Sequence, residues 1–246
     1  QNQNFNNICA PFLEVVTKNQ FELTLVKEIF MISAQDVKQF GFRDSRLENL
    51  YLPSLLAADT YSFAYNNFTT INLSKLQRLA GSHTFSNCSF LKQFIALNLL
   101  NINRNCFSQC GNLMVVLTPI ASSDDYVFEN CSCCKLETIL VQDSVFRCNC
   151  QKCPKCCGTM QKCIKRGQKL KKTCEYDNLA KIEKVDENFV RMQMKQIQLE
   201  TLVMKYGFLC VKFIKPQQKQ KQLKQIKEQV VKIIELVQLF DVFAQE

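Results

Sequence analysis

The sequence lacks several residue types that common functional sites require. Tryptophan is absent, His83 is the only histidine, and the 246 residues include only six glycines. A single histidine excludes a zinc site built mainly from histidine and leaves little for general-base catalysis at neutral pH. No P-loop, glycine-rich cofactor turn, Ser-His-Asp or Cys-His arrangement or pair of catalytic carboxylates is visible in the sequence. We therefore expect a protein that is not an enzyme.

A membrane-spanning run is also missing from the sequence. No stretch of about 18 uninterrupted apolar residues occurs, and the best candidate, Tyr206 to Ile214, is short and contains Lys212. The chain begins with Gln1 rather than Met, so the start of the sequence leaves open a signal peptide that has been removed. With 47% hydrophobic and 22% charged residues, the composition is that of a globular protein. We expect no membrane span in these residues.

Phenylalanine, in contrast, is abundant and recurs at a nearly constant spacing. Successive anchor residues are separated by 21, 22, 22 and 21 residues, and they are Phe42, Phe63, Phe85, Phe107 and Phe128. The last three begin F-x-x-C units that end at Cys88, Cys110 and Cys131, whereas Ser45 and Asn66 hold the cysteine position in the first two. A period of this length indicates a solenoid, because such a unit buries its apolar face only by stacking on its neighbours.

Each anchor is followed by a short apolar element with L-x-x-L-x-L spacing, as in residues 47–52 and 136–141. The alternation predicts one short strand per unit, with the last two apolar residues facing inward. Pro53 and Pro119 follow two of these elements, where a missing N–H is tolerated at a strand end. A second apolar pair predicts a returning segment before the next anchor, and its examples are Leu55 and Ala58, Leu76 and Leu79, and Leu99 and Ile102.

These features together resemble the BspA-like leucine-rich repeat family, whose units follow F-x-x-C-x-x-L-x-x-I-x-L-P. The resemblance covers about residues 25–150. It implies an α/β leucine-rich-repeat solenoid with one short parallel strand per repeat of about 22 residues. Members of the family occur in bacteria and parasitic protists, often as surface or secreted proteins that mediate adhesion. The resemblance therefore implies a protein-binding or adhesion scaffold at the cell surface or outside the cell, rather than in the cytoplasm, with a cell-surface or host ligand.

We divide the chain into four parts. Residues 1–147 hold the repeats, residues 148–175 form a cysteine- and lysine-rich insertion or cap, and residues 176–215 are predicted to be degenerate repeats. The last assignment rests on Leu199-Glu-Thr-Leu202-Val-Met204, which echoes residues 136–141, and on Ile182, Val185 and Phe189. Residues 216–246 show helical apolar spacing, which predicts an amphipathic helix, although a last degenerate repeat fits as well.

The predicted strands suggest where a partner would bind. Residues that lie between the inward positions project from the sheet, and they are Tyr51, Asn72, Ile95, Leu117 and Leu140. Four of these five are apolar or aromatic, and strands about 4.8 Å apart would align them in one stripe. An exposed apolar stripe is typical of an interaction surface, so we predict that this column binds a protein partner. The alternatives are β-propensity alone or a register error that turns the stripe inward.

Six cysteines lie between Cys148 and Cys163. Overlapping C-x-x-C pairs are typical of loops that present two thiolates to a tetrahedral zinc ion, and our candidate ligands are Cys150, Cys153, Cys156 and Cys163. Two alternatives stay open: a disulfide-linked cap over the last repeat, and free thiols in an irregular loop. The repeated Cys88, Cys110 and Cys131 are instead expected to be small buried thiols.

The positive charge is confined to the C-terminal part. Residues 1–147 hold 11 basic and 12 acidic residues, whereas residues 148–246 hold 20 basic and 10 acidic ones. Eight basic residues and no acidic one fall within residues 148–174. An alternative function is therefore a zinc-organised basic module that binds nucleic acid or an anionic surface. Nucleic acid is the less favoured partner, because no aromatic residue interleaves these charges to stack on bases.

Overall fold

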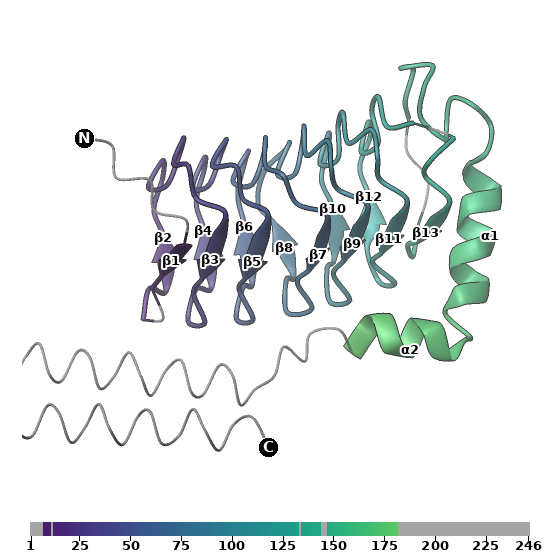
Figure 1. The fold of residues 1–246 in the computed structure, drawn as a ribbon. Helices are drawn as coiled ribbons and strands as arrows, with labels where there is room; N and C mark the ends of the chain where they lie inside the picture. Colours follow the sequence, from purple (N-terminus) through teal and green to yellow (C-terminus); the bar gives the residue numbers. More distant parts are fainter. Residues whose placement is uncertain (1–6, 11, 133, 144–146, 182–246) are drawn as a thin grey trace, which may run out of the picture. The chain divides into compact units, whose positions relative to one another are not determined.

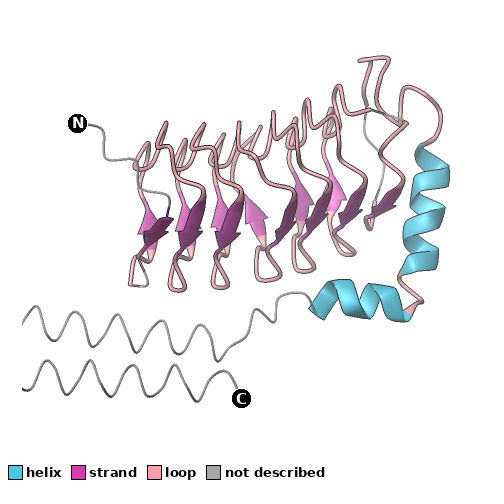
Figure 2. Ribbon diagram, viewed as in Figure 1, coloured by secondary structure: helices cyan, strands magenta, loops and turns pink. Residues whose placement is uncertain are grey.

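The computed structural model describes residues 7–10, 12–132, 134–143 and 147–181, which form stacked coils followed by two helices (Figure 1). Each coil but the last described one contributes two short strands on different sides (Figure 2), and the last contributes β13 alone. The longer strands are β1 (Asn7–Cys9), β3 (Glu28–Phe30), β5 (Asn49–Tyr51), β7 (Thr70–Asn72), β9 (Gln93–Ile95), β11 (Val115–Leu117) and β13 (Thr138–Leu140). The shorter ones are β2 (Val15–Val16), β4 (Asp36–Val37), β6 (Ala57–Ala58), β8 (Arg78–Leu79), β10 (Asn101–Ile102) and β12 (Ser122–Ser123).

All strand pairs of the described coils are parallel, and strands pair with their equivalents in neighbouring coils except between β5 and β7 and between β8 and β10. The longer strands form two sheets, which we call the first sheet (β1-β3-β5) and the second sheet (β7-β9-β11-β13). The middle residue of each strand faces the core, as in the pairs Ile71 with Phe94 and Val116 with Ile139. The predicted parallel solenoid is confirmed. The shorter strands are an addition, because the returning segment was predicted without a strand.

Most of the predicted inward positions are buried, and Leu50 and Val141 are partly buried against the core. Leu52, Ala96 and Thr118 lie in the core after the middle residues of β5, β9 and β11. The returning pairs are buried as well, and they include Leu55 with Ala58. This is the expected result of stacking units that each have one apolar side, because burial of these side chains supplies the main favourable free energy.

The anchors form one continuous column of stacked rings through the core. Phe42 and Phe63 lie 5.6 Å apart between ring centroids, and Phe107 and Phe128 lie 5.8 Å apart. The column begins one coil earlier than predicted, at Phe21, which stacks on Phe42 at 5.2 Å. Phe21 precedes Phe42 by 21 residues, so the same period contained the signal for this sixth anchor.

A third set of hydrogen bonds joins the coils along the anchor segments. In most coils the anchor and the residues two before and two after it donate their N–H groups to the next coil. Both flanking residues adopt a left-handed backbone conformation, as at Tyr61 (φ 54°) and Tyr65 (φ 61°) around Phe63. Such a φ is uncommon for residues other than glycine. Here the bonds to the next coil hold it in place, at 3.2 Å from Tyr61 N to Ser82 O and 3.0 Å from Tyr65 N to Ser86 O.

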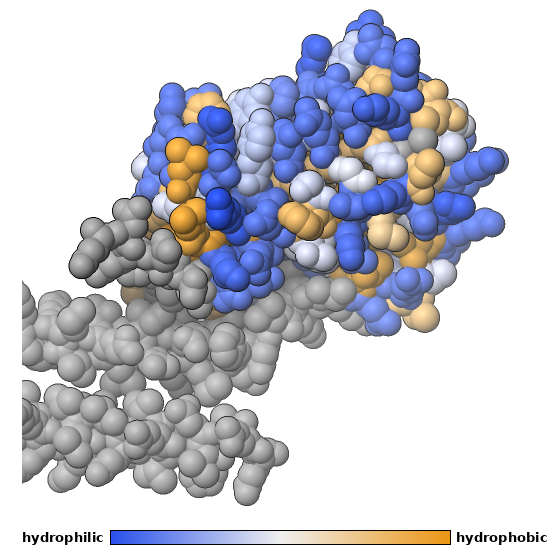
Figure 3. All heavy atoms as spheres, turned by 45° about the horizontal axis from the view of Figure 1, so that its top comes forward, coloured by the Kyte–Doolittle hydropathy of each residue, from blue (hydrophilic) through white to orange (hydrophobic). Residues whose placement is uncertain are grey.

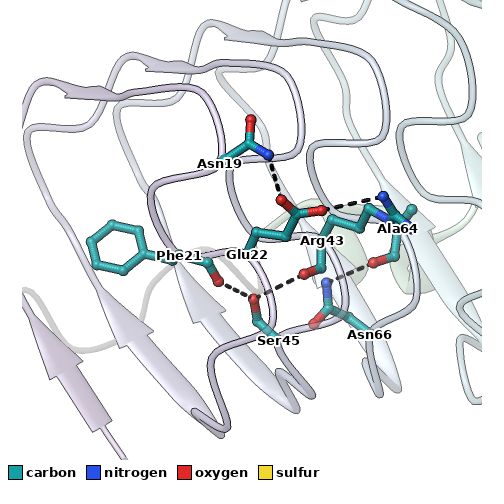
Figure 4. Close-up of polar contacts among 7 residues, drawn as sticks. All are labelled: Asn19, Phe21, Glu22, Arg43, Ser45, Ala64 and Asn66. Carbon is teal, nitrogen blue, oxygen red and sulfur yellow. Dashed lines mark hydrogen bonds and ion pairs between the residues drawn. The ribbon is translucent and has the colours of Figure 1, made fainter.

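The residue three after each anchor acts as a buried hydrogen-bond donor. Ser45 Oγ donates to the carbonyl oxygen of Phe21 at 2.5 Å, and the Asn66 amide donates to Ala64 O (Figure 4). The Asn66 amide also donates to Phe42 O at 2.8 Å. The thiols of Cys88, Cys110 and Cys131 donate to the anchor carbonyl of the preceding coil at 3.4, 3.2 and 3.0 Å. Serine, asparagine and cysteine can replace one another at this position because each donates a hydrogen bond to the equivalent buried carbonyl.

Two helices follow the last coil. Helix α1 (Met160–Leu170) buries Met160, Cys163 and Ile164 in the repeat core. It approaches β13 closely at Gly167, where an added Cβ would lie 2.2 Å from the Ile139 carbonyl oxygen. Helix α2 (Cys174–Lys181) comes directly after it. Helix α1 thus packs against the last described strand, β13, while the division that makes residues 148–175 an insertion or a cap stays a prediction.

Part of the predicted organisation lies outside the described residues. Residues 176–181 belong to α2, while the remainder of the predicted degenerate repeats, with Leu199, Leu202 and Met204, is not described. The same holds for the predicted helix within residues 216–246. Both assignments stay predictions. Neither α1 nor α2, the helices of the described part, has the length and apolarity needed to cross a membrane.

Candidate functional site

The predicted partner-binding residues share one place in the fold. Together with Phe30 they are the last residues of β3, β5, β7, β9, β11 and β13, and we call them the third-position column. The parallel register aligns Phe30 with Tyr51 in the first sheet, and it aligns the other four with one another in the second sheet. Its members are Phe30, Tyr51, Asn72, Ile95, Leu117 and Leu140. The structure therefore brings the five predicted residues together and adds Phe30. That residue was missed because its strand precedes Phe42, the first anchor recognised in the sequence.

In the first sheet this column is partly exposed. Phe30 and Tyr51 stack with ring centroids 4.8 Å apart and an interplanar angle of 16°. The first residues of the same strands, Glu28 and Asn49, are exposed beside them and joined by a hydrogen bond of 3.1 Å. This part of the face thus presents two aromatic rings next to polar side chains, a combination that is enriched at protein interfaces.

In the second sheet the column is covered, which corrects the prediction of one exposed stripe. Ile95 and Leu117 are fully buried and Leu140 nearly so. They form a second hydrophobic cluster, against which Leu170 at the end of α1 and Tyr176 and Leu179 of α2 pack. The apolar side chains at these three positions are thus part of the packing between the strand face and the helices. The sequence shows apolar residues at outward positions but not what covers them.

Asn72 lies where the covered and uncovered parts meet. It belongs to the first strand of the second sheet, next to the break between β5 and β7. Both polar atoms of its side-chain amide are buried and make no hydrogen bond. A buried amide without partners is costly, since its desolvation is uncompensated. This position therefore weakens the solenoid locally.

Elsewhere on the described coils, exposed apolar residues are scattered. Leu23, Phe90 and Leu100 are the most exposed with Phe12, each at 57% or more. Figure 3 shows a largely hydrophilic surface with separate hydrophobic spots, the clearest of which lies over the N-terminal coils. Singly exposed apolar residues are normal on protein surfaces and identify no site by themselves.

The repeated cysteines cannot serve as nucleophiles. Cys88, Cys110 and Cys131 are fully buried. Burial raises the pKa of the Cys88 thiol to about 12 and that of Cys110 well above its ordinary value. A thiol is reactive as its thiolate, so these groups are inert at neutral pH. They are free thiols whose role in the described coils is the buried hydrogen bond, as expected for small buried cysteines.

The cysteine-rich segment gathers four thiols, although one differs from the prediction. The sulfur atoms of Cys148, Cys150, Cys153 and Cys156 all lie within 4.8 Å of one another, and we call this group the four-cysteine cluster. Cys163, the fourth predicted ligand, is instead buried on α1, where its thiol donates to Leu136 O at 3.1 Å. Cys148 was missed because the C-x-x-C spacing starts at Cys150, whereas Cys148 enters through a C-x-C pair.

The thiols of the four-cysteine cluster differ in their pKa values. Burial would raise the pKa of Cys150, but backbone N–H groups of Asn130, Lys152 and Cys153 and the side chain of Cys148 lower this pKa to about 6. Burial raises the pKa of Cys148 to about 11 and that of Cys153 well above its ordinary value. One group of the cluster thus favours the thiolate and two favour the thiol. This is the pattern in which neighbouring thiols share protons.

The basic residues of the segment face outward on α1. Lys162, Lys165, Arg166 and Lys169 are exposed, and the buried residues of the helix lie on the opposite side. The charges are therefore available at the surface of the cap rather than engaged with the solenoid.

Comparisons with known proteins agree with this architecture. The family described as "BspA type Leucine rich repeat region" matches residues 14–135 in six copies. Among solved structures, the crystal structure of the pneumococcal vaccine antigen PcpA is similar, with a TM-score of 0.51 and 16% sequence identity over 57% of this chain. The match spans 41% of that chain, so the likeness concerns part of it and shows the fold. No curated protein sequence matches.

Proposed function

Because residues 14–135 are a BspA-type leucine-rich repeat region, we propose that this chain is a non-enzymatic scaffold that binds a protein partner on the face of its first sheet. One observation carries the proposal. In the third-position column, Phe30 and Tyr51 are partly exposed and stacked, while Ile95, Leu117 and Leu140 are covered by helices.

The chemistry of this face fits a protein ligand. Stacked aromatic rings offer a large apolar surface that loses little conformational entropy on binding, and aromatic residues are enriched among the residues that dominate binding energy. The exposed Glu28, Asn49 and Thr70 supply polar groups around them. A solenoid also offers an extended binding surface, since equivalent positions of successive coils lie next to one another.

We further propose a cell-surface or extracellular location and a role in adhesion. This part of the proposal draws on the family resemblance, in which such repeats are found on surface and secreted proteins. It also defines a direct assay, because adhesion is measured on whole cells and does not require the ligand to be identified first.

The experiment compares two double variants that introduce the same charge. Beads coated with the purified chain are allowed to settle on cultured epithelial cells, and the number retained after washing is counted against albumin-coated beads. Phe30→Lys with Tyr51→Lys should lower retention several-fold. The matched control, Phe90→Lys with Leu100→Lys, alters two exposed apolar residues outside the third-position column and should retain full adhesion. Equal retention by both variants, or no retention of the unmodified chain above albumin, would overturn the proposal.

A second candidate function rests on the outward basic face of α1. Lys162, Lys165 and Lys169 are exposed on one side of a helix whose other side is buried, which is the arrangement of a contact for an anionic surface. The chain should then bind vesicles that contain phosphatidylserine and ignore neutral ones, and binding should decline with salt. Replacing these three lysines by glutamine should abolish it. Binding to duplex DNA but to neither vesicle would instead favour a nucleic-acid contact.

A further inference from the structure

We propose that the four-cysteine cluster is a tetrathiolate site for one zinc ion, formed by Cys148, Cys150, Cys153 and Cys156, that closes the C-terminal end of the solenoid. Three features support this assignment: the distances between sulfur atoms, the N–H group that donates to one of the sulfurs, and the packing of the cluster against the repeat core.

Two of the sulfur separations match the edges of a zinc tetrahedron, and all four sulfurs lie within 4.8 Å of one another. Zinc binds thiolate sulfur at about 2.3 Å, so two sulfurs of a tetrahedral site lie about 3.8 Å apart. Cys150 and Cys156 are separated by 3.9 Å between sulfur atoms, and Cys153 and Cys156 by 3.6 Å. A disulfide brings its two sulfurs to about 2.05 Å, which neither pair approaches. The space between the sulfurs suits a single ion and is too small for an iron–sulfur cluster, which places further iron and sulfide atoms between its ligands.

A backbone N–H group supports one of the sulfurs, as in a metal-binding knuckle. The N–H of Cys153 donates to Cys150 Sγ at 3.4 Å. Such bonds stabilise a thiolate and orient it, which is the usual role of groups around a metal ligand.

The cluster packs against the core of the repeats. Cys153 is part of the buried core, and Cys148, Cys150 and Cys156 pack against it. In the five coils before the last anchor, Phe128, the residue two after the anchor donates its N–H to a carbonyl of the next coil, as Gln109 does to Glu129 O at 2.9 Å. The cluster follows the last anchor segment in the chain, so a bound zinc ion would hold its thiols against the end of the stack.

Zinc binding at this site is a simple exchange. Zinc–sulfur bonds form, the protons of those cysteines that are thiols pass to solvent, and no group is oxidised or reduced. The free energy of binding is then coupled to the fold of residues 148–156 and to the last coil beneath them. This inference goes beyond the proposed protein-binding function and does not depend on it, since the site lies in the cap and not on the first sheet.

The test measures zinc in the full chain purified under reducing conditions with added zinc chloride. We expect one zinc per chain after dialysis, and a cobalt(II)-loaded sample should show the intense absorption of several thiolate ligands. Cys148→Ser should weaken zinc binding by more than about 100-fold, since it removes a direct ligand and loss of supporting groups alone costs 10- to 100-fold. Cys163→Ser and Cys157→Ser should leave it unchanged. Cys163→Ser keeps a hydroxyl donor for Leu136 O, as Ser45 does for Phe21.

A measurement on the unmodified chain covers the case in which Cys148→Ser fails to fold. Thiol labelling of the native protein should spare four cysteines more with zinc bound than after removal of zinc by a strong chelator. Full zinc content in folded Cys148→Ser, zinc loss in Cys163→Ser, or an unmodified chain that binds no zinc would each overturn the assignment. Blocked thiols that are released by reductant alone would identify a disulfide-linked cap instead.

Discussion

The first and second sheets are both built from parallel, in-register strands, but they differ in the exposure of their outward residues. In the first sheet the third-position column consists of Phe30 and Tyr51, which stack on each other and are partly exposed. In the second sheet the same position holds Ile95, Leu117 and Leu140, and helices α1 and α2 cover them. An apolar residue at an outward strand position is therefore either partly exposed, as in the first sheet, or covered, as in the second. The helices that follow the repeats provide this cover.

The strongest test of this difference compares the same truncation on the two sheets. Leu117→Ala should lower the free energy of unfolding by about 3 kcal/mol, because it leaves a cavity between the strand face and the helices. Tyr51→Ala removes a partly exposed ring and one stacking contact, so the expected loss is about 1 kcal/mol. Urea denaturation of both variants measures the two values. Equal losses would mean that the sheets do not differ in this way.

The two ends of the repeat region also differ in their buried donors. Asn66 accepts a hydrogen bond from Leu47 N at 2.9 Å and donates to Phe42 O and Phe63 O, whereas Cys110 donates one bond to Phe85 O. Asn66→Ala leaves several buried groups unsatisfied and should lower the free energy of unfolding by about 2 to 3 kcal/mol. Cys110→Ala, measured in the same urea series, should lower it by about 1 kcal/mol. A larger loss for Cys110→Ala would show that the thiols contribute mainly by packing.

Much of this organisation was predictable from the sequence because it repeats. The anchor period indicated the column of rings, and the L-x-x-L-x-L spacing indicated the inward residues, since both follow from local pattern. The cover over Leu117 was not predictable, because it depends on contact between residues far apart in the chain. Cys148 and Cys163 show the same limit. Spacing identifies thiols that lie near each other in sequence, but the helical turn that carries Cys163 into the core is a consequence of packing.

The contact between cap and second sheet is tested at Gly167. An added Cβ there would meet the carbonyl oxygen of Ile139 at 2.2 Å, so Gly167→Ala should push α1 away from β13. We expect a loss of about 1 to 2 kcal/mol in the free energy of unfolding and faster amide exchange in β13. Gly111→Ala is the matched control, because nothing lies within 4 Å of an added Cβ at that position. It should be neutral or slightly stabilising, and protected β13 amides in Gly167→Ala would show that α1 adjusts without moving.

The smallest expected effect is on the pH dependence of stability and comes from His83, which follows β8 in the middle of the repeat region. Its ring extends the surface stack of Phe40 and Tyr61, at 4.6 Å from the Tyr61 ring. Burial is the main cause of the lowered pKa of His83; Arg104 also lowers it and Glu129 opposes the shift. A folded-state pKa below the unfolded value near 6.5 means that the unfolded chain binds the proton more readily. This contribution to stability is therefore complete above pH 6.5 and is lost as the pH falls from there through the lowered pKa.

The single histidine makes this effect easy to isolate. His83→Phe keeps an aromatic ring in the same left-handed conformation that Phe40 adopts (φ 58°), but it cannot be protonated. The unfolding midpoint in urea should fall between pH 7 and pH 5 by more in the unmodified chain than in His83→Phe. The difference between the two chains isolates the imidazole from other groups that titrate in this range, such as Cys150. An identical pH dependence in both would show that the His83 ring is as well hydrated in the folded chain as in the unfolded one. The surface stack of Phe40, Tyr61 and His83 would then be packed less tightly than the anchor rings in the core.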